Sequence, residues 1–210
     1  MNQILITRLR KKKNILFFKI EFLFSILIIT LCLLSLLYFS YQKNVRQNLS
    51  SALLSNYHIS KLYSPTDIYL TELNHIENSK EPYVIGVIQI DKLNISYPIL
   101  STTTDELLKI SVCRFYGPSL NSVGNVCIAG HNYNDGSFFS NLDKLKYGDI
   151  IGVIDDTNSK LDYIVYEKYE TNSNDISCTS QETNNLKVVT LVTCNNFNGN
   201  RLIIKAKHLN

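Results

Sequence analysis

One long apolar run lies near the start of the chain. Residues 22–41 contain no charged side chain, and about 20 apolar residues in a helix are enough to cross the hydrocarbon core of a bilayer. Lys19 and Glu21 precede the run, and Lys43 follows it. Basic residues cluster at positions 8–13, so the positive-inside rule predicts a cytoplasmic N-terminus and an extracellular chain beyond residue 42.

A cleaved signal peptide is the alternative, because it also begins with basic residues followed by an apolar stretch. Its apolar stretch is shorter and ends in small residues, whereas residues 36–42 read Leu-Leu-Tyr-Phe-Ser-Tyr-Gln, without an Ala-x-Ala-like site. A buried helix of a soluble protein would show some polar periodicity. We therefore expect a single-pass anchor: a basic cytoplasmic segment (1–21), a transmembrane helix (22–41) and an extracellular, partly helical stalk (42–82), which could also pack on the following domain.

From Tyr83 onward, short apolar and β-branched runs alternate with turn signals. Strands are expected at residues 84–90, 95–100, 125–130, 149–154, 161–169, 186–193 and 202–206. Short helices are expected at 104–110, where Thr104 is a suitable N-cap, and at 137–145. Seven or eight short strands with only short helices between them favour a mainly β domain, a closed barrel or a sandwich, over residues 83–210.

Composition excludes several other classes of protein. The net charge of +3 comes from the N-terminal cluster and is too small to indicate nucleic-acid binding. The five cysteines are irregularly spaced and include no CxxC pair, so neither a disulfide framework nor a thiolate zinc site is expected. Cys113 and Cys127 are expected to be small buried residues. The spacing of Asp135, Asp155 and Asp156 fits no calcium loop, and we expect no metal or cofactor.

Candidate chemistry gathers at three strand ends. Cys194 ends one expected strand and is followed by the loop Asn-Asn-Phe-Asn-Gly-Asn, after which Arg201 opens the next strand. His131 ends another strand, and we expect Gly130 to let the backbone turn there. A thiolate is a nucleophile, an imidazole can move its proton, and a guanidinium can hold a carbonyl oxygen. These three groups together suffice for acyl transfer from a peptide.

These residues resemble the sortase family. TLVTC, residues 190–194, matches the TLxTC signature, and His131 and Arg201 fall where the family keeps its histidine and arginine. The resemblance covers about residues 83–207 and includes the N-terminal anchor. It implies an eight-stranded β-barrel and cleavage of an LPxTG-like signal between Thr and Gly, with a thioacyl intermediate on Cys194. It also implies that Thr193 shapes the substrate groove, with Ala129 and Val192 as further groove candidates.

The resemblance further implies partners and a setting. The substrates would be surface proteins with a C-terminal sorting signal, and the acceptor would be an amine of a peptidoglycan precursor in a Gram-positive cell wall. Residues 64–67 lack the Asp-Pro-aromatic lid motif of pilin-polymerising members, and no second apolar span precedes residue 210. Residues 169–186 are too few for the helical insertion of class B. The layout is therefore nearest to class D or class A.

Two other functions remain open from the sequence. A hydrolytic cysteine endopeptidase would use the same cysteine and histidine, although papain-like enzymes have them in the opposite order. A non-enzymatic surface domain would also combine an anchor with a β-domain.

Overall fold

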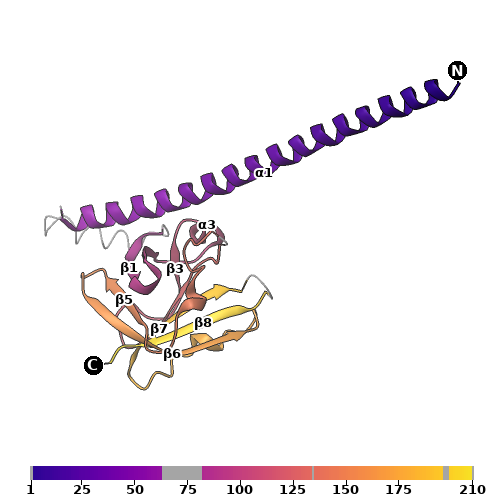
Figure 1. The fold of residues 1–210 in the computed structure, drawn as a ribbon. Coiled ribbons are helices and arrows are strands. Elements are labelled where there is room, and N and C mark those ends of the chain that lie inside the picture. Colours follow the sequence, from indigo (N-terminus) through magenta and orange to yellow (C-terminus); the bar gives the residue numbers. More distant parts are fainter. Residues whose placement is uncertain (1, 63–81, 134, 196–198, 210) are drawn as a thin grey trace. The chain divides into compact units, whose positions relative to one another are not determined.

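The computed structural model describes residues 2–62, 82–133, 135–195 and 199–209 (Figure 1). The chain divides into two units, Met1–Asn44 and Val45–Asn210. The first unit is formed by helix α1 (Asn2–Leu62), which continues into the second. Residues 17–41 of α1 are exposed, although most of them are apolar. The helix is thus long and apolar enough to cross a membrane, a property shared by membrane anchors and signal sequences.

The second unit is a closed barrel of eight strands, which confirms the expected fold class. The strands are β1 (Val84–Ile90), β2 (Ile95–Leu100), β3 (Val112–Tyr116), β4 (Gly124–Ala129), β5 (Ile150–Asp155), β6 (Lys160–Thr171), β7 (Lys187–Cys194) and β8 (Arg201–Lys207). Their order around the barrel is β1-β2-β3-β4-β7-β8-β6-β5. The β2–β3 and β4–β7 pairs are parallel, and the other described pairs are antiparallel.

Strand β3 is the one that the sequence pattern did not predict. It has only five residues, with Arg114 at its centre, and its register against β4 shifts between Arg114 and Tyr116. A short strand with a charged central residue and a bulge lacks the regular alternation by which strands are recognised. The other seven strands lie within two residues of their expected ends.

The two expected helices have different outcomes. Helix α3 (Asp105–Leu108) forms within the first, and the Leu107 N–H donates to Oγ1 of Thr104, the expected cap, over 3.2 Å. The prediction of a helix over 137–145 is wrong, because only the 3₁₀ turn η2 (Leu142–Lys144) forms there. Phe138 has φ 53°, a left-handed conformation that interrupts any α-helix. The helix-like apolar spacing arises instead from side chains that this connection buries in the core.

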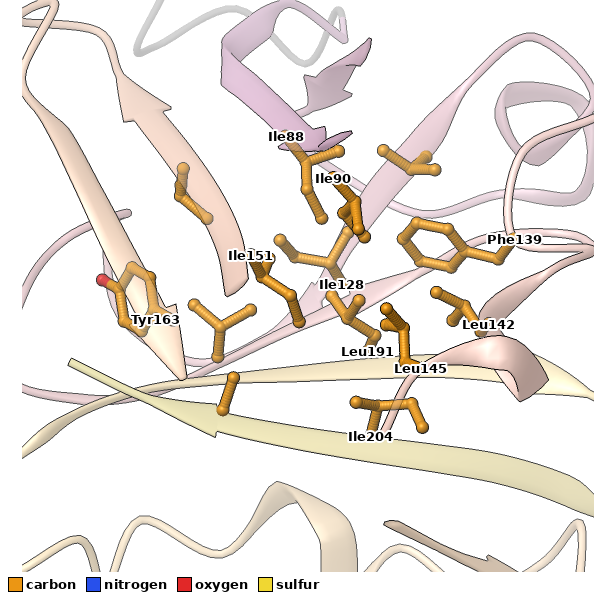
Figure 2. Close-up of a cluster of buried hydrophobic side chains, with 14 of the residues drawn as sticks. Ile88, Ile90, Ile128, Phe139, Leu142, Leu145, Ile151, Tyr163, Leu191 and Ile204 are labelled. Carbon is orange, nitrogen blue, oxygen red and sulfur yellow. The ribbon is translucent and has the colours of Figure 1, made fainter. Parts of the chain in front are cut away.

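The core lies inside the barrel, where alternate residues of the strands meet (Figure 2). Ile88 and Ile90 come from β1, Ile151 from β5, Leu191 from β7 and Ile204 from β8, and all are fully buried. Because side chains alternate along a strand, the residues between the core positions face outward. This alternation decides which residues of β4, β7 and β8 can form a site on the outer surface.

The last part of α1, from Val45 onward, packs on the barrel within the same unit. Its less exposed positions are spaced as one helical face: Arg46, Ser50, Leu53, Leu54 and Tyr57. Oγ of Ser50 lies 3.5 Å from Oγ of Ser111, and the Tyr57 hydroxyl donates to the Asp155 carbonyl over 3.2 Å. The alternative of packing therefore holds for this part of residues 42–82. Residues 63–81 lie outside the described part of the chain.

Candidate active site

The parallel pairing of β4 with β7 brings the predicted histidine and cysteine together. Ala129 is the register partner of Val192. Continuing the same register by two residues places His131 opposite Cys194. Because two-residue steps along a strand keep the same face, all four side chains belong to the outer face of the sheet. Cys194 is exposed there, and His131 is partly buried.

Two side-chain hydrogen bonds hold the residues on either side of His131. Oγ1 of Thr193 donates to the Gly130 carbonyl over 2.7 Å, and Nδ2 of Asn132 donates to the Cys194 carbonyl over 2.7 Å. Thr193 is buried, so its side chain lies behind the exposed face and not on it. His131 is therefore fixed, before and after, to the strand end that carries the thiol.

Gly130 is needed for a different reason from the one expected. Its φ lies outside the left-handed region in which glycine is favoured. A Cβ at this position would lie 2.7 Å from Cδ2 of Phe139, closer than packed carbon atoms allow. The glycine therefore permits close packing of Phe139 beneath the strand end, and the expectation of a glycine turn is wrong.

Arg201 lies on the other side of Cys194. The two residues are register partners across the β7–β8 hairpin, and the Asn195 N–H donates to the Asn200 carbonyl over 2.7 Å at its end. Cβ atoms of directly opposed residues are about 4.5–5.5 Å apart. Strands β4, β7 and β8 are neighbours in the barrel, so the three predicted catalytic residues form one row on one face.

The surroundings of His131 favour the neutral imidazole. Burial lowers the pKa of His131 below its usual value, and the positive charges of Lys109 and Arg46 lower it further. The Asp105 carboxylate acts in the opposite direction. A neutral imidazole can accept a proton from a thiol, which is the first step required of a general base. The ring of Tyr133 lies beside that of His131, with 5.0 Å between the ring centroids.

The other cysteines of the barrel are unsuited to nucleophilic chemistry. Cys113 and Cys127 are fully buried, as expected, and burial raises the pKa of each thiol to about 12. Cys178 is also buried, and burial raises its pKa. A thiol that stays protonated near neutral pH is a poor nucleophile. Among the described cysteines of the second unit, Cys194 alone is exposed.

The β6–β7 connection, residues 172–186, forms a wall packed on the outer face of the sheet. Its 3₁₀ turn η3 (Ser177–Thr179) carries Cys178, which packs against Val192, Ile203 and Tyr169 on the outer face of the sheet. Val192 is buried under this cover, whereas Ala129 is partly exposed. The two predicted groove residues are register partners on the same face as Cys194, and Val192 packs against Cys178 of this wall.

Asn125 of β4 fixes the wall to the barrel. Its Nδ2 donates to the carbonyls of Cys178 (2.9 Å) and Ser180 (3.1 Å), and its Oδ1 accepts from Oγ1 of Thr190 (2.7 Å). The Gln181 side chain adds hydrogen bonds with the Asn125 backbone N–H and carbonyl. Asn125 is 2% exposed, so these bonds replace those that water would otherwise make.

Replacing Asn125 by alanine is expected to lower the free energy of unfolding by about 2 kcal/mol, because buried carbonyls would lose their donor. Urea unfolding followed by circular dichroism measures the change. Asn174→Ala is the matched control, since Asn174 is exposed on the same connection. Equal stability of the two variants would show that Asn125 does not hold the wall.

A cavity of about 440 Å³ lies beside Cys194, between the β4–β5 connection, β6 and the start of the β7–β8 loop, and neither His131 nor Arg201 lines it. Its polar lining includes Asn132, Tyr133, Glu170 and Asn195, together with Cys194. Nδ2 of Asn195 donates to the Glu170 carboxylate over 2.7 Å. Apart from Cys194, the sequence did not indicate these lining residues, although Asn132 and Tyr133 directly follow His131. No cluster of metal-ligating side chains occurs within the described ranges.

Comparison with known proteins agrees with this geometry. The family model described as the sortase domain matches residues 88–209, more than half of the chain, and the chain therefore belongs to the sortase family of cysteine transpeptidases. No curated protein sequence matches it. Family membership confirms the resemblance seen in the sequence and argues against a non-enzymatic surface domain.

Solved structures of several sortases have similar folds. The Clostridium perfringens sortase D5 transpeptidase is 27% identical with a TM-score of 0.65, over 78% of this chain and 99% of that chain. Sortase C1 from Streptococcus agalactiae is 27% identical with a TM-score of 0.54, over 60% and 68% of the two chains. A lid mutant of sortase A from Corynebacterium diphtheriae shares the fold, with 24% identity and a TM-score of 0.58 over 80% and 95%.

Proposed function

We propose that this sortase cleaves an LPxTG-like sorting signal between Thr and Gly and transfers the released protein to an amine of the cell wall. The observation that carries the proposal is the placement of Cys194 between His131 and Arg201 on one exposed face. The similarity to sortase D5 over almost all of that chain supports a class D-like layout. Helix α1 would anchor the enzyme, with its N-terminus in the cytoplasm and the barrel outside.

In the first half of the reaction, His131 accepts the proton of the Cys194 thiol. The thiolate sulfur attacks the carbonyl carbon of the threonine, and Arg201 stabilises the charge on the carbonyl oxygen. As the C–N bond breaks, His131 protonates the leaving amino group of glycine. The sorted protein remains attached to Cys194 through a thioester.

In the second half, the acceptor amine attacks the thioester carbon. His131 takes the extra proton of the amine and returns it to the departing sulfur of Cys194, so that an amide forms and the free thiol is restored. An acceptor belonging to a peptidoglycan precursor would link the protein to the wall. If water attacks instead, the products are those of a cysteine endopeptidase.

The test uses the full chain in detergent with an LPxTG-like peptide, with and without an added glycine-based amine. Mass spectrometry should show the peptide joined to the amine through threonine, formed at the expense of the carboxylic acid product. Formation of the acid alone, at every amine concentration, would identify an endopeptidase and contradict the proposal.

A further inference from the structure

Arg46 joins the helical segment before the barrel to the loop that follows the candidate histidine. It lies on the packed face of α1, pairs with the carboxylate of Asp135, and its side chain is 18% exposed. Its guanidinium carbon also lies 4.1 Å from the centroid of the Tyr133 ring. A guanidinium over an aromatic face is attracted by the ring, and the attraction strengthens when both groups are shielded from water. Arg46 therefore contacts two residues of one loop.

Tyr133 passes this contact on to the imidazole. Its ring centroid lies 5.0 Å from that of His131 and 5.9 Å from that of Phe138. Arg46, Tyr133 and His131 thus form a continuous series of contacts from α1 to the candidate base. An imidazole can rotate about its side-chain bonds unless a neighbouring group restricts it. The Tyr133 ring lies beside that of His131 and therefore limits this rotation.

The loop after His131 is also held by hydrogen bonds of its own, near His131 and near Asp135. The Phe139 N–H donates to the His131 carbonyl over 3.0 Å, and Asn132 and Phe138 form an isolated β-bridge. Oδ1 of Asp135 accepts from the Ser137 N–H over 2.9 Å. With Asp135 already oriented by the loop, its pairing with Arg46 fixes the loop to the helix rather than merely neutralising a charge.

The charges near His131 affect its protonation, so the loss of Arg46 can be detected in the pH dependence of the reaction. The charges of Asp105 and Lys109 act on the imidazole from α3 and the residue after it, that of Arg46 acts from α1, and the Tyr133 ring lies beside the imidazole. The Arg46 charge opposes protonation of His131, as that of Lys109 does, whereas the Asp105 charge favours it. Loss of Arg46 should therefore make His131 easier to protonate.

We propose that Arg46 is a positioning residue for the sortase reaction, which orients His131 by stacking on Tyr133 and pairing with Asp135. This inference rests on the proposed function, because it assigns a task to the base of that reaction. It makes the segment of α1 that begins at Val45 part of the catalytic unit. Arg46 itself touches no reacting atom.

The test compares Arg46→Ala and Arg46→Lys with wild type in the full chain, in detergent, with the LPxTG-like peptide and amine. Arg46→Ala should lower kcat about 10-fold or more, because small displacements of a catalytic group are costly, while KM stays within about twofold. The acidic limb of its pH profile should move to higher pH, since a nearby cation is lost. Arg46→Lys keeps the charge but not the planar group that stacks on Tyr133. The acidic limb of its pH profile should therefore stay near the wild-type position while kcat falls.

Two controls separate positioning from folding. Gln47→Ala changes an exposed neighbour on the same helix and should match wild type. In a double-mutant cycle with Tyr133→Ala, the effects of Arg46→Ala should be clearly less than additive, because Arg46 acts through Tyr133. If circular dichroism shows that Arg46→Ala does not fold, kcat and the pH profile of Arg46→Lys and Asp135→Asn are compared with those of wild type instead.

The outcomes distinguish this inference from the function on which it rests. Wild type that forms no transpeptidation product overturns the proposed function and the inference with it. Active wild type with folded Arg46 variants that keep both kcat and pH profile overturns the inference alone. A loss of kcat that merely follows the unfolded fraction, with an unchanged pH limb, also overturns it, because the role would then be structural.

Discussion

Replacing Cys194 by alanine is expected to abolish transpeptidation and to leave the barrel folded. No thioester can form without the sulfur, and loss of a covalent nucleophile lowers kcat by about 10⁴-fold or more. Folding should be unaffected because the Cys194 side chain is exposed at a strand end. The measurements are amide product by mass spectrometry and thermal unfolding by circular dichroism. Product formation at even one-tenth of the wild-type rate would exclude Cys194 as the nucleophile.

The remaining cysteines supply the control for that experiment. Cys178→Ala removes the buried thiol within the β6–β7 connection and should keep most of the activity, although it opens a small gap beside Val192. Thiol alkylation gives a second readout on a Cys32→Ser background, which removes the exposed thiol of α1. Label should enter Cys194 of the folded protein and not Cys113 or Cys127, whose pKa values are raised to about 12. Equal labelling of all three would contradict the assignment.

Replacing Arg201 by glutamine is expected to lower kcat by about 10²–10³-fold with little change in KM. Removing one preorganised donor to a developing oxyanion has effects of this size, and a donor that acts mainly in the transition state changes kcat rather than substrate binding. Arg201→Lys should recover only part of the loss, since a lysine cannot present two parallel donors. Steady-state kinetics with the LPxTG-like peptide and a saturating amine measure both parameters.

Lys205 provides the matched control for Arg201. It lies four residues further along β8 and therefore on the same face, where it pairs with Glu167 at 3.4 Å. Lys205→Gln removes a positive charge from that face at a greater distance from Cys194 and should leave kcat within about twofold, because a side chain four residues along β8 cannot reach the carbonyl oxygen held beside Cys194. Equal losses in Arg201→Gln and Lys205→Gln would mean that general charge, not a directed donor, supports the reaction.

Local patterns in the sequence predicted much of the fold, because seven strands and the long helix each carry an apolar run of the right length and period. Strand β3 was missed where a charged residue and a bulge break that period. Residues 137–145 were misassigned because side chains that fill the barrel are spaced there as on a helix. The period of a short apolar segment reports burial and does not by itself identify the element.

The residues of the candidate site also fall into those that the sequence could predict and those that it could not. His131, Cys194 and Arg201 were recognisable because each stands at the end of a strand or, for His131, two residues beyond it, within a short local motif. The Asn132–Cys194 hydrogen bond joins residues 62 positions apart, and the Arg46–Asp135 pair joins residues 89 apart. Such contacts depend on strand order around the barrel and on where α1 packs. Neither follows from the residues near each partner, so the roles of Asn132, Tyr133 and Arg46 could not be predicted.

The parallel β4–β7 pair has a consequence for when the enzyme acquires its reactivity. Parallel strands cannot be joined by a tight turn, and here β5 and β6 lie between them in the sequence. Pairings between distant segments form late in folding, because the entropy of closing a long loop opposes them. Cys194 therefore has no histidine beside it until the barrel is nearly complete. A nascent or misfolded chain would carry only an ordinary thiol, and activity would report on a finished fold.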